Sequence, residues 1–402
     1  MGSNKEAIVI DPRRDCQIYT NLAHKEKMKI KYIFETHRNE DYVVGSIQLS
    51  HLTGAKIFHG SGLDFKFGEK IKDNHIFSFG KMKLRAIHTP GHTDESMSYA
   101  LFDETLKQQT IMVFTGDTLF IGDVGRTDLY GIEEAPRLAE NLYDSIFNKI
   151  LPLGDGVILC PAHGGGSICG GEISDQEWST LGLERFNNSV LKKSKKEFIK
   201  FKVNEKLDRP PYFKKMEQMN LEGPSLLNDI PNPPPLSPKE FKDLIDDNAL
   251  ILDTRKPSAF GGSHIKESIN IWLNGLPVFG GWILTYDRPI VLILDNSQNL
   301  RKAVHYLIRL GFDKIGGYLC GGTEECGIES WYTDALPIET GGLLTIHELK
   351  KWLDQNKDLF VLDVRTDKEW EKGNIKDINH IYEKELGTLF TYRRYGHPRL
   401  WQ

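Results

Sequence analysis

Three short polar motifs in the first half of the chain each follow an apolar run and each supply a side chain that binds metals. His37 comes directly after KYIFET, His92 lies in TPGHT, and Asp117 lies in TGDTLF. Because the apolar runs have the length and composition of buried strands, these side chains are expected at strand ends. Two imidazoles and one carboxylate can hold a metal by one face and leave the opposite positions open. The sequence therefore predicts a metal site made by His37, His92 and Asp117.

The elements that must position these ligands alternate between strands and turn-rich or amphipathic stretches. Short apolar segments such as AIVID, TIMVFTGD and GVILC follow one another between Ala7 and about Ile168. Residues 172–230 are lysine-rich and compatible with helices, and the proline run PNPPPLSP at 231–238 then stiffens the chain into a spacer. We expect a metal-binding α/β domain over residues 1–232.

An internal repeat follows the proline run. LILDTR at 250–255 matches FVLDVR at 360–365, an offset of 110 residues, and the surrounding aromatic and aliphatic positions match at the same offset. Strands that alternate with helices indicate a parallel α/β unit. The repeat predicts one such domain at 236–340 and a partial second copy at 343–402.

Length, charge and cysteine content limit the function. A chain of 402 residues is long enough for two or three cores. The net charge of -5, from 51 basic and 56 acidic side chains, gives no strong positive field for nucleic acid or anionic lipid. The charged N-terminus and the absence of long apolar runs predict a cytoplasmic protein without a membrane span. Five scattered cysteines fit a reducing compartment, and we expect small-molecule partners and a possible homo-oligomer.

The motifs HRNEDY, TPGHT, TGD and PAHG stand in the order of the metallo-β-lactamase superfamily, which residues 7–230 resemble. The resemblance implies an αββα sandwich. In that family the first motif usually is His-x-His-x-Asp-His, but here Asn39 and Tyr42 replace the second and third histidines. Amide and phenol groups bind divalent transition metals more weakly than imidazole does. A site for two zinc ions is therefore not expected.

The chain further resembles the persulfide dioxygenase, or sulfur dioxygenase, branch of that superfamily. The stretches TGDTLFIGDVGRTDL and PAHGGGSICGG are similar to its signatures, as is the fusion to rhodanese-like units. The resemblance implies one Fe(II) per chain, held by His37, His92 and Asp117. The implied reaction oxidises a low-molecular-weight thiol persulfide with dioxygen to sulfite and thiol, in sulfide detoxification. The alternatives are a zinc thioester hydrolase of the glyoxalase II type and an inactive sulfur carrier or scaffold.

Other site residues follow from the same resemblance. His163 and Asp41 are expected to orient water or substrate as further catalytic residues. Arg126, with Thr127, is expected to bind a carboxylate of the thiol carrier, or else to pair with Asp123 or Asp128. Cys169 either carries sulfur at the substrate site or is structural. Whether the carrier is glutathione, coenzyme A or another thiol stays open.

Several further expectations concern cysteines and chain ends. Cys160 ends the apolar strand GVILC and is predicted to be a buried packing residue. The first repeat copy resembles a rhodanese domain, but its active-loop segment, from Asn296, contains no cysteine. Cys320 and Cys326 are either redox-active or packed. The offset would put the second copy's loop at about residue 406, beyond Gln402, and relatives begin with an earlier strand, so both ends are expected to be incomplete.

Overall fold

The structure is a computed structural model of the chain. It describes residues 1–103, 109–227, 229–320, 327–342, 344–355, 359–376 and 378–382. The chain divides into two compact units, Met1–Ile230 with Ile308–Gly311 and Pro231–Leu307 with Phe312–Gln402. Within the described ranges, no helix is long and apolar enough to cross a membrane.

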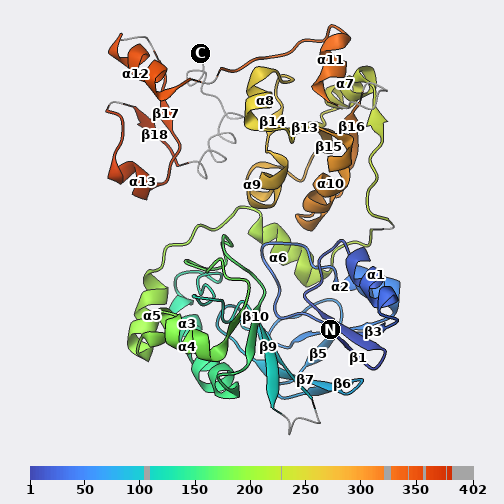
Figure 1. Ribbon diagram of the computed structural model, residues 1–402, viewed down its shortest axis with the longest axis vertical. Helices are drawn as coiled ribbons and strands as arrows, with labels where there is room; N and C mark the ends of the chain where they lie inside the picture. The colour runs from blue at the N-terminus through green and yellow to red at the C-terminus, as the bar shows by residue number, and fades with distance from the viewer. Residues whose placement is uncertain are drawn as a thin grey trace. The chain divides into compact units, whose positions relative to one another are not determined.

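Two sheets face each other in the first unit (Figure 1). The first has the order β1-β2-β3-β4-β5 and contains β1 (Gly2–Ser3), β2 (Glu6–Ile10), β3 (Lys29–Phe34), β4 (Lys56–Gly60) and β5 (Glu69–Ile71). The second has the order β11-β10-β9-β8-β7-β6 and contains β6 (Ile76–Phe79), β7 (Met82–His88), β8 (Met97–Asp103), β9 (Thr110–Gly116), β10 (Ile158–Pro161) and β11 (Ser179–Thr180). The buried rings of Phe34 in β3 and Tyr99 in β8 join one cluster, with centroids 5.0 Å apart. The two sheets therefore share one apolar core.

Helices cover the outer face of each sheet. The helices of the first unit are α1 (Gln17–Lys25), α2 (Ser46–Thr53), α3 (Ala135–Ser145), α4 (Leu181–Asn187), α5 (Lys195–Asn204) and α6 (Phe213–Glu222). Leu49 of α2 packs in one cluster with Ile33 of the first sheet, and Leu142 of α3 packs in another with Val113 of the second. This arrangement confirms the predicted αββα sandwich.

The strand directions bring the polar motifs to one edge of the second sheet. β8 runs antiparallel to both β7 and β9, and β10 runs parallel to β9. Because β7, β9 and β10 therefore point the same way, the loops that follow them leave from the same edge. These loops carry His92, Asp117 and His163. His92 and Asp117 therefore lie just past the ends of strands, as the sequence predicted.

The second unit contains a parallel sheet of order β12-β16-β15-β13-β14. Its strands are β12 (Pro235–Leu236), β13 (Leu250–Asp253), β14 (Ile269–Asn270), β15 (Ile290–Ile293) and β16 (Ile315–Leu319). Its helices are α7 (Pro238–Asp246), α8 (Pro257–Gly262), α9 (Leu276–Ile283), α10 (Leu300–Arg309) and α11 (Ile328–Thr333). Strands and helices alternate along the chain, as the sequence predicted for a rhodanese-like α/β domain.

The predicted second copy repeats the local structure of the first. It contains α12 (Ile346–Asp354), β17 (Leu362–Asp363), α13 (Asp367–Lys372) and β18 (Asn379–His380). The guanidinium of Arg255 donates to both oxygens of Asp253, and that of Arg365 donates in the same way to Asp363. β17 pairs in parallel with β18, just as β13 pairs with β14. The internal repeat is therefore structural.

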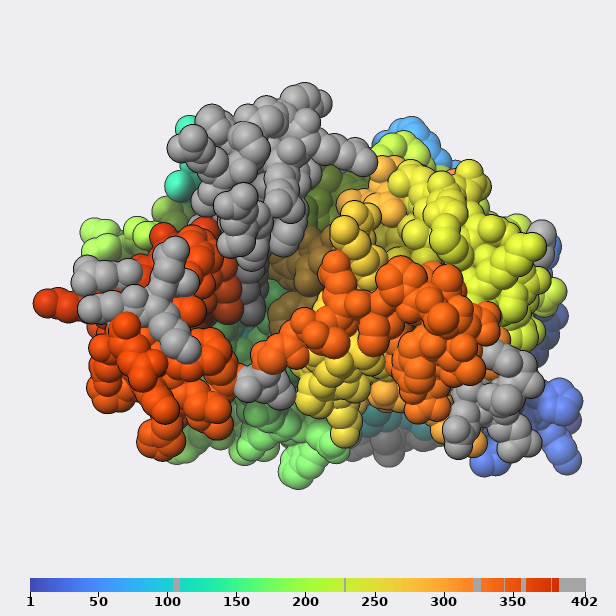
Figure 2. All heavy atoms as spheres, turned by 90° about the horizontal axis from the view of Figure 1, so that it is seen from above, coloured from blue at the N-terminus to red at the C-terminus, as the bar shows by residue number. Residues whose placement is uncertain are grey.

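Burial distinguishes the two copies. Leu250 of the first copy is 4% exposed, whereas Phe360, at the matching position of the second, is 54% exposed. Ile265 and its counterpart Ile375 are 4% and 42% exposed. The orange-red atoms of this segment are visible on the face drawn in Figure 2. The described part of the second copy therefore has local hydrogen bonding like that of the first without its buried core.

We predict unequal effects of truncating the two matching side chains. Leu250→Ala should lower the free energy of unfolding of the second unit by about 2–5 kcal/mol, because it leaves a cavity in the core. Phe360→Ala should change it by less than about 1 kcal/mol, because Phe360 is already 54% exposed. Urea unfolding followed by tryptophan fluorescence measures both, since Trp178 is the only one of seven tryptophans in the first unit. Equal losses for the two variants would contradict the difference in packing.

Candidate metal centre

The three predicted ligands converge in the interior of the first unit. His37, His92 and Asp117 are each at most 2% exposed. Asp117 Oδ2 lies 3.8 Å from His37 Nε2 and 3.5 Å from His92 Nε2. The two imidazole rings lie nearly perpendicular, with centroids 4.9 Å apart. The residues that the sequence singled out thus form one cluster.

Hydrogen bonds on the outer side fix the tautomer of each imidazole. The Thr36 hydroxyl lies 2.8 Å from an Asp11 oxygen, to which it donates, and 2.8 Å from His37 Nδ1. The hydroxyl oxygen therefore accepts from His37 Nδ1-H. Nδ1-H of His92 donates to the carbonyl oxygen of Arg126 at 3.1 Å. Both Nε2 atoms then direct their lone pairs into the cluster. Metal-bound histidines usually have such a partner for the other ring N-H.

A glycine brings the ends of β3 and β9 together. Gly116 has a φ of 53°, and a Cβ there would lie 2.6 Å from Thr36 Oγ1. A larger residue would be strained and would displace the threonine that orients His37. Gly116 therefore allows Asp117 to approach the histidine on the facing sheet.

The structure adds one residue that sequence reasoning missed. Glu40 is fully buried, and its Oε1 lies 3.1 Å from His92 Nε2. The ligand atoms of His37, Glu40, His92 and Asp117 all lie within 4.8 Å of one another. Glu40 stands at a variable position of the family motif, so the comparison with that motif did not single it out as a ligand. Its place three residues after His37 in the same loop was the available signal.

The residues of the cluster shift one another's protonation in different directions. Burial lowers the pKa of His37 to about 4. Burial would also lower the pKa of His92, but the carboxylates of Glu40 and Asp117 outweigh it and raise that pKa to about 9. Two buried carboxylates thus attract positive charge to this point. A divalent cation supplies the same charge.

Unsatisfied polar atoms show that the cluster fits a metal. Within the described residues, His37 Nε2, His92 Nε2, Glu40 Oε2 and both Asp117 carboxylate oxygens are buried without a hydrogen-bond partner. Buried polar groups rarely lack partners unless an ion or water satisfies them. Ligands bound at about 2.0–2.2 Å to one ion are about 3.0–3.6 Å apart, close to the separations above. The donor set suits iron or zinc.

A second group of candidate ligands borders the first. Asp41, His163 and Cys169 offer atoms within 4.8 Å of one another, and His163 Nε2 lies 3.4 Å from Asp117 Oδ1. The side chains of Asp41 and His163 are 17% and 12% exposed, so this is the more open side. Burial, with the charge of Asp41, raises the pKa of the Cys169 thiol well above its usual value. Cys169 is therefore protonated at neutral pH.

Arg126 makes a buried pair with Asp128, one of the two partners considered from the sequence. Its Nε and Nη2 donate to Asp128 at 2.7 and 2.8 Å, and its Nη1 donates to the carbonyl oxygens of Ile168 and Asp208. Thr127 is buried, and its hydroxyl lacks a hydrogen-bond partner within the described part of the chain. Arg126 thus fastens the loop before Cys169, while binding of a substrate carboxylate by Arg126 or Thr127 stays a prediction.

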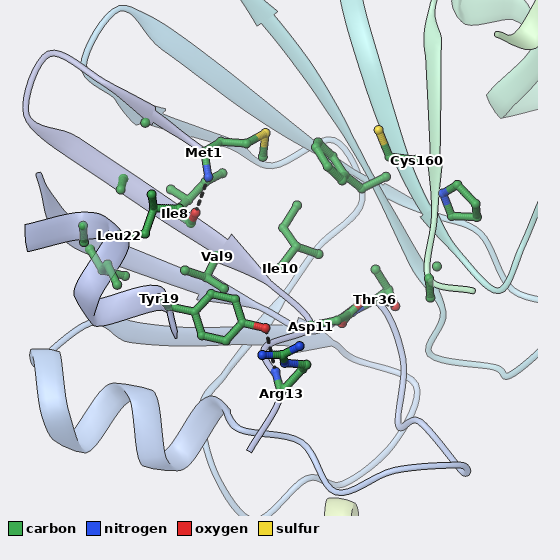
Figure 3. Close-up of a pocket in the computed structure, with 18 of the residues that line it drawn as sticks. Met1, Ile8, Val9, Ile10, Asp11, Arg13, Tyr19, Leu22, Thr36 and Cys160 are labelled. Atoms are coloured by element: carbon green, nitrogen blue, oxygen red, sulfur yellow. Dashed lines mark hydrogen bonds between the residues drawn. The ribbon is translucent and has the colours of Figure 1, made fainter. Parts of the chain in front are cut away.

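A cavity of about 790 Å³ reaches the more open side of the cluster. Its wall includes Ile8 and Ile10 of β2 and Tyr19 of α1 (Figure 3). The lining also includes Asp41 and His163. Cys160, expected to be buried, is partly exposed and lines this cavity, so that expectation was wrong. Its strand is apolar, but its last residues face the cavity. Of the two cysteines expected to be either redox-active or packed, Cys320 is buried and Cys326 lies outside the described residues.

The αββα sandwich with its converging histidines and carboxylates defines the class, a protein of the metallo-β-lactamase fold with a candidate metal site. Residues 1–163 match the metallo-beta-lactamase superfamily, and residues 237–328 match the rhodanese-like domain. A crystal structure of a metallo-beta-lactamase from Staphylococcus aureus subsp. aureus COL superposes with a TM-score of 0.70 at 31% identity, over 79% of this chain and 93% of that one.

Among the curated relatives, two are similar to parts of this chain. The mitochondrial persulfide dioxygenase ETHE1 of Bos taurus is 32% identical over 52% of this chain and 74% of its own length. The hydroxyacylglutathione hydrolase of Dictyostelium discoideum is 31% identical over 40% of this chain, and the match spans only 58% of that relative. The chain belongs to the metallo-β-lactamase superfamily, with persulfide dioxygenases among its homologues, and carries a rhodanese-like domain behind the metal-binding fold.

We predict that Asn39→His with Tyr42→His raises zinc occupancy, because imidazole binds zinc better than amide or phenol. Asn39 has a φ of 44°, a conformation that histidine adopts more readily than most residues, so the first change should be tolerated. Elemental analysis of the double variant should show a second bound metal. If the double variant binds no more metal than the native chain does, these two positions do not set the number of metals.

Proposed function

We propose that this chain is an iron-dependent persulfide dioxygenase that converts a low-molecular-weight thiol persulfide to sulfite and thiol. The reaction is R-S-SH + O2 + H2O → R-SH + SO3²⁻ + 2 H⁺. The observation that carries the proposal is the buried cluster of His37, His92 and Asp117, beside Asn39 and Tyr42 in place of further histidines. The similarity to persulfide dioxygenase ETHE1 supports the same reaction class.

Iron would supply the redox change that oxygen chemistry needs, which zinc lacks. The chain's own residues orient the ligands: Thr36 accepts from His37, and the Arg126 carbonyl accepts from His92. The apolar cavity adjoins Asp41 and His163, so the persulfide would approach from that side. There His163 and Asp41, 3.5 Å apart, are positioned to hold a water or the substrate. We infer that the persulfide terminus meets these two groups.

Metal content and product together test the proposal. Protein purified without oxygen should contain about one iron per chain, and it should consume oxygen and form sulfite from glutathione persulfide. Asp117→Ala should lose both iron and oxygen uptake, because it removes an anionic ligand that faces both imidazoles. Native protein that holds zinc and cleaves a glutathione thioester would instead support a hydrolase. Absence of any bound metal would support a scaffold.

We also predict that the chain lacks sulfurtransferase activity of its own. The loop between β15 and α10 contains Asn296, whose side chain accepts from the Gln298 N-H, but it contains no cysteine. Without a thiolate, nothing there attacks thiosulfate. Formation of thiocyanate from thiosulfate and cyanide should stay at background. Turnover that disappears in Cys320→Ser or Cys326→Ser would move the sulfur-transfer site to that segment.

A further inference from the structure

Glu40 brings a second carboxylate into contact with both histidines of the cluster. Its side chain is 0% exposed. Oε1 lies 3.1 Å from His92 Nε2, and Oε2 lies 3.9 Å from His37 Nε2. The turn at Asn39 separates His37 from Glu40 and lets both side chains reach the same centre. Glu40 is therefore as close to the imidazoles as Asp117 is.

The donors around Glu40 do not account for a buried carboxylate beside a bound metal. When a metal occupies His37 Nε2 and His92 Nε2, neither nitrogen carries a proton to donate. Within the described residues, the hydrogen-bond donor that remains is the Cys169 thiol, whose Sγ lies 3.6 Å from Oε1, and Oε2 has no hydrogen-bond partner there. A thiol is a weak donor. An ionised carboxylate left in this position would be strongly destabilising unless it met a cation.

Charge balance points the same way. Two carboxylates, Asp117 and Glu40, carry two negative charges into a buried site whose histidines are neutral when bound to metal. A divalent cation cancels these charges, so the complete site is neutral. With Asp117 as its only anionic ligand, the ion and its ligands together would keep one positive charge in the protein interior, which costs free energy. Glu40 removes that cost when it binds the ion.

We propose that Glu40 is a fourth protein ligand, so that the centre is a site of two histidines and two carboxylates. The inference rests on the proposed function in one respect, namely that the site holds a divalent metal. For a six-coordinate ion, four protein ligands leave two open positions instead of three. The site would then accept the persulfide sulfur and one further small ligand, and no more.

The test measures metal binding by the whole chain without substrate. Glu40→Gln keeps the size of the side chain but removes its charge and replaces it with a poor ligand. Affinity for Fe(II) or Co(II), determined by competition with a chelator, should fall by more than the ~100-fold seen when an outer hydrogen-bond partner is lost. The absorption bands of the Co(II) form should change, because they report the number and type of ligands. Glu40→Asp keeps the carboxylate and should recover at least about tenfold of the lost affinity.

Glu95→Gln is the matched control. Glu95 is also fully buried, but it accepts a hydrogen bond from the backbone N-H of Arg38 and is not one of the four converging side chains. This variant should keep native affinity within about threefold. Native affinity in Glu40→Gln, an unchanged Co(II) spectrum, or an equal loss in both variants would overturn the proposal. Dependence of metal affinity on Glu40 in a protein that consumes no oxygen would sustain the ligand assignment and refute the oxygenase function.

Discussion

The burial of carboxylates beside imidazoles is the constraint on which the candidate metal centre depends. Asp117 and Glu40 lie in the interior, and their neighbours in the cluster are imidazoles. Such an arrangement is stable only when positive charge is supplied, either by protonation of a histidine or by a bound ion. The fold meets this constraint by joining loops from both sheets at one point. Folding of this edge and metal binding are therefore coupled processes.

The outer hydrogen bonds explain why loops can hold such a centre. Asp11, at the end of β2, accepts from both the backbone N-H and the hydroxyl of Thr36. Thr36 in turn accepts from Nδ1-H of His37. Asp11, which follows β2, therefore orients through Thr36 a histidine that follows the neighbouring strand β3. On the other sheet, the side chain of Arg126 fastens the loop that contains Cys169, while its carbonyl orients His92. A substitution at Arg126 would act on the loop first and on the ligand only through the backbone.

Sequence reasoning predicted the parts of this structure that follow from local pattern. Apolar strands that end in histidine or aspartate located His37, His92 and Asp117, because strand direction places such ends at one edge. Glu40 was missed, because the chemistry of a loop residue depends on where the turn directs its side chain. Cys160 was placed wrongly, since an apolar strand does not show which of its faces adjoins a cavity. The direction of a loop side chain and the position of a cavity cannot be predicted from residue type alone.

The rhodanese-like repeat shows the same division between local and tertiary information. The Asp-Arg fork forms in both copies, through Arg255 and Arg365, because its partners are two residues apart and need nothing else. Burial of the strand that carries the aspartate requires other elements to cover both faces of the sheet. Leu250 has β15 beside its strand and is buried, whereas Phe360, with the same local sequence pattern, is exposed. A repeat in sequence therefore predicts repeated local geometry, but the stability of each copy depends on the strands and helices that cover it.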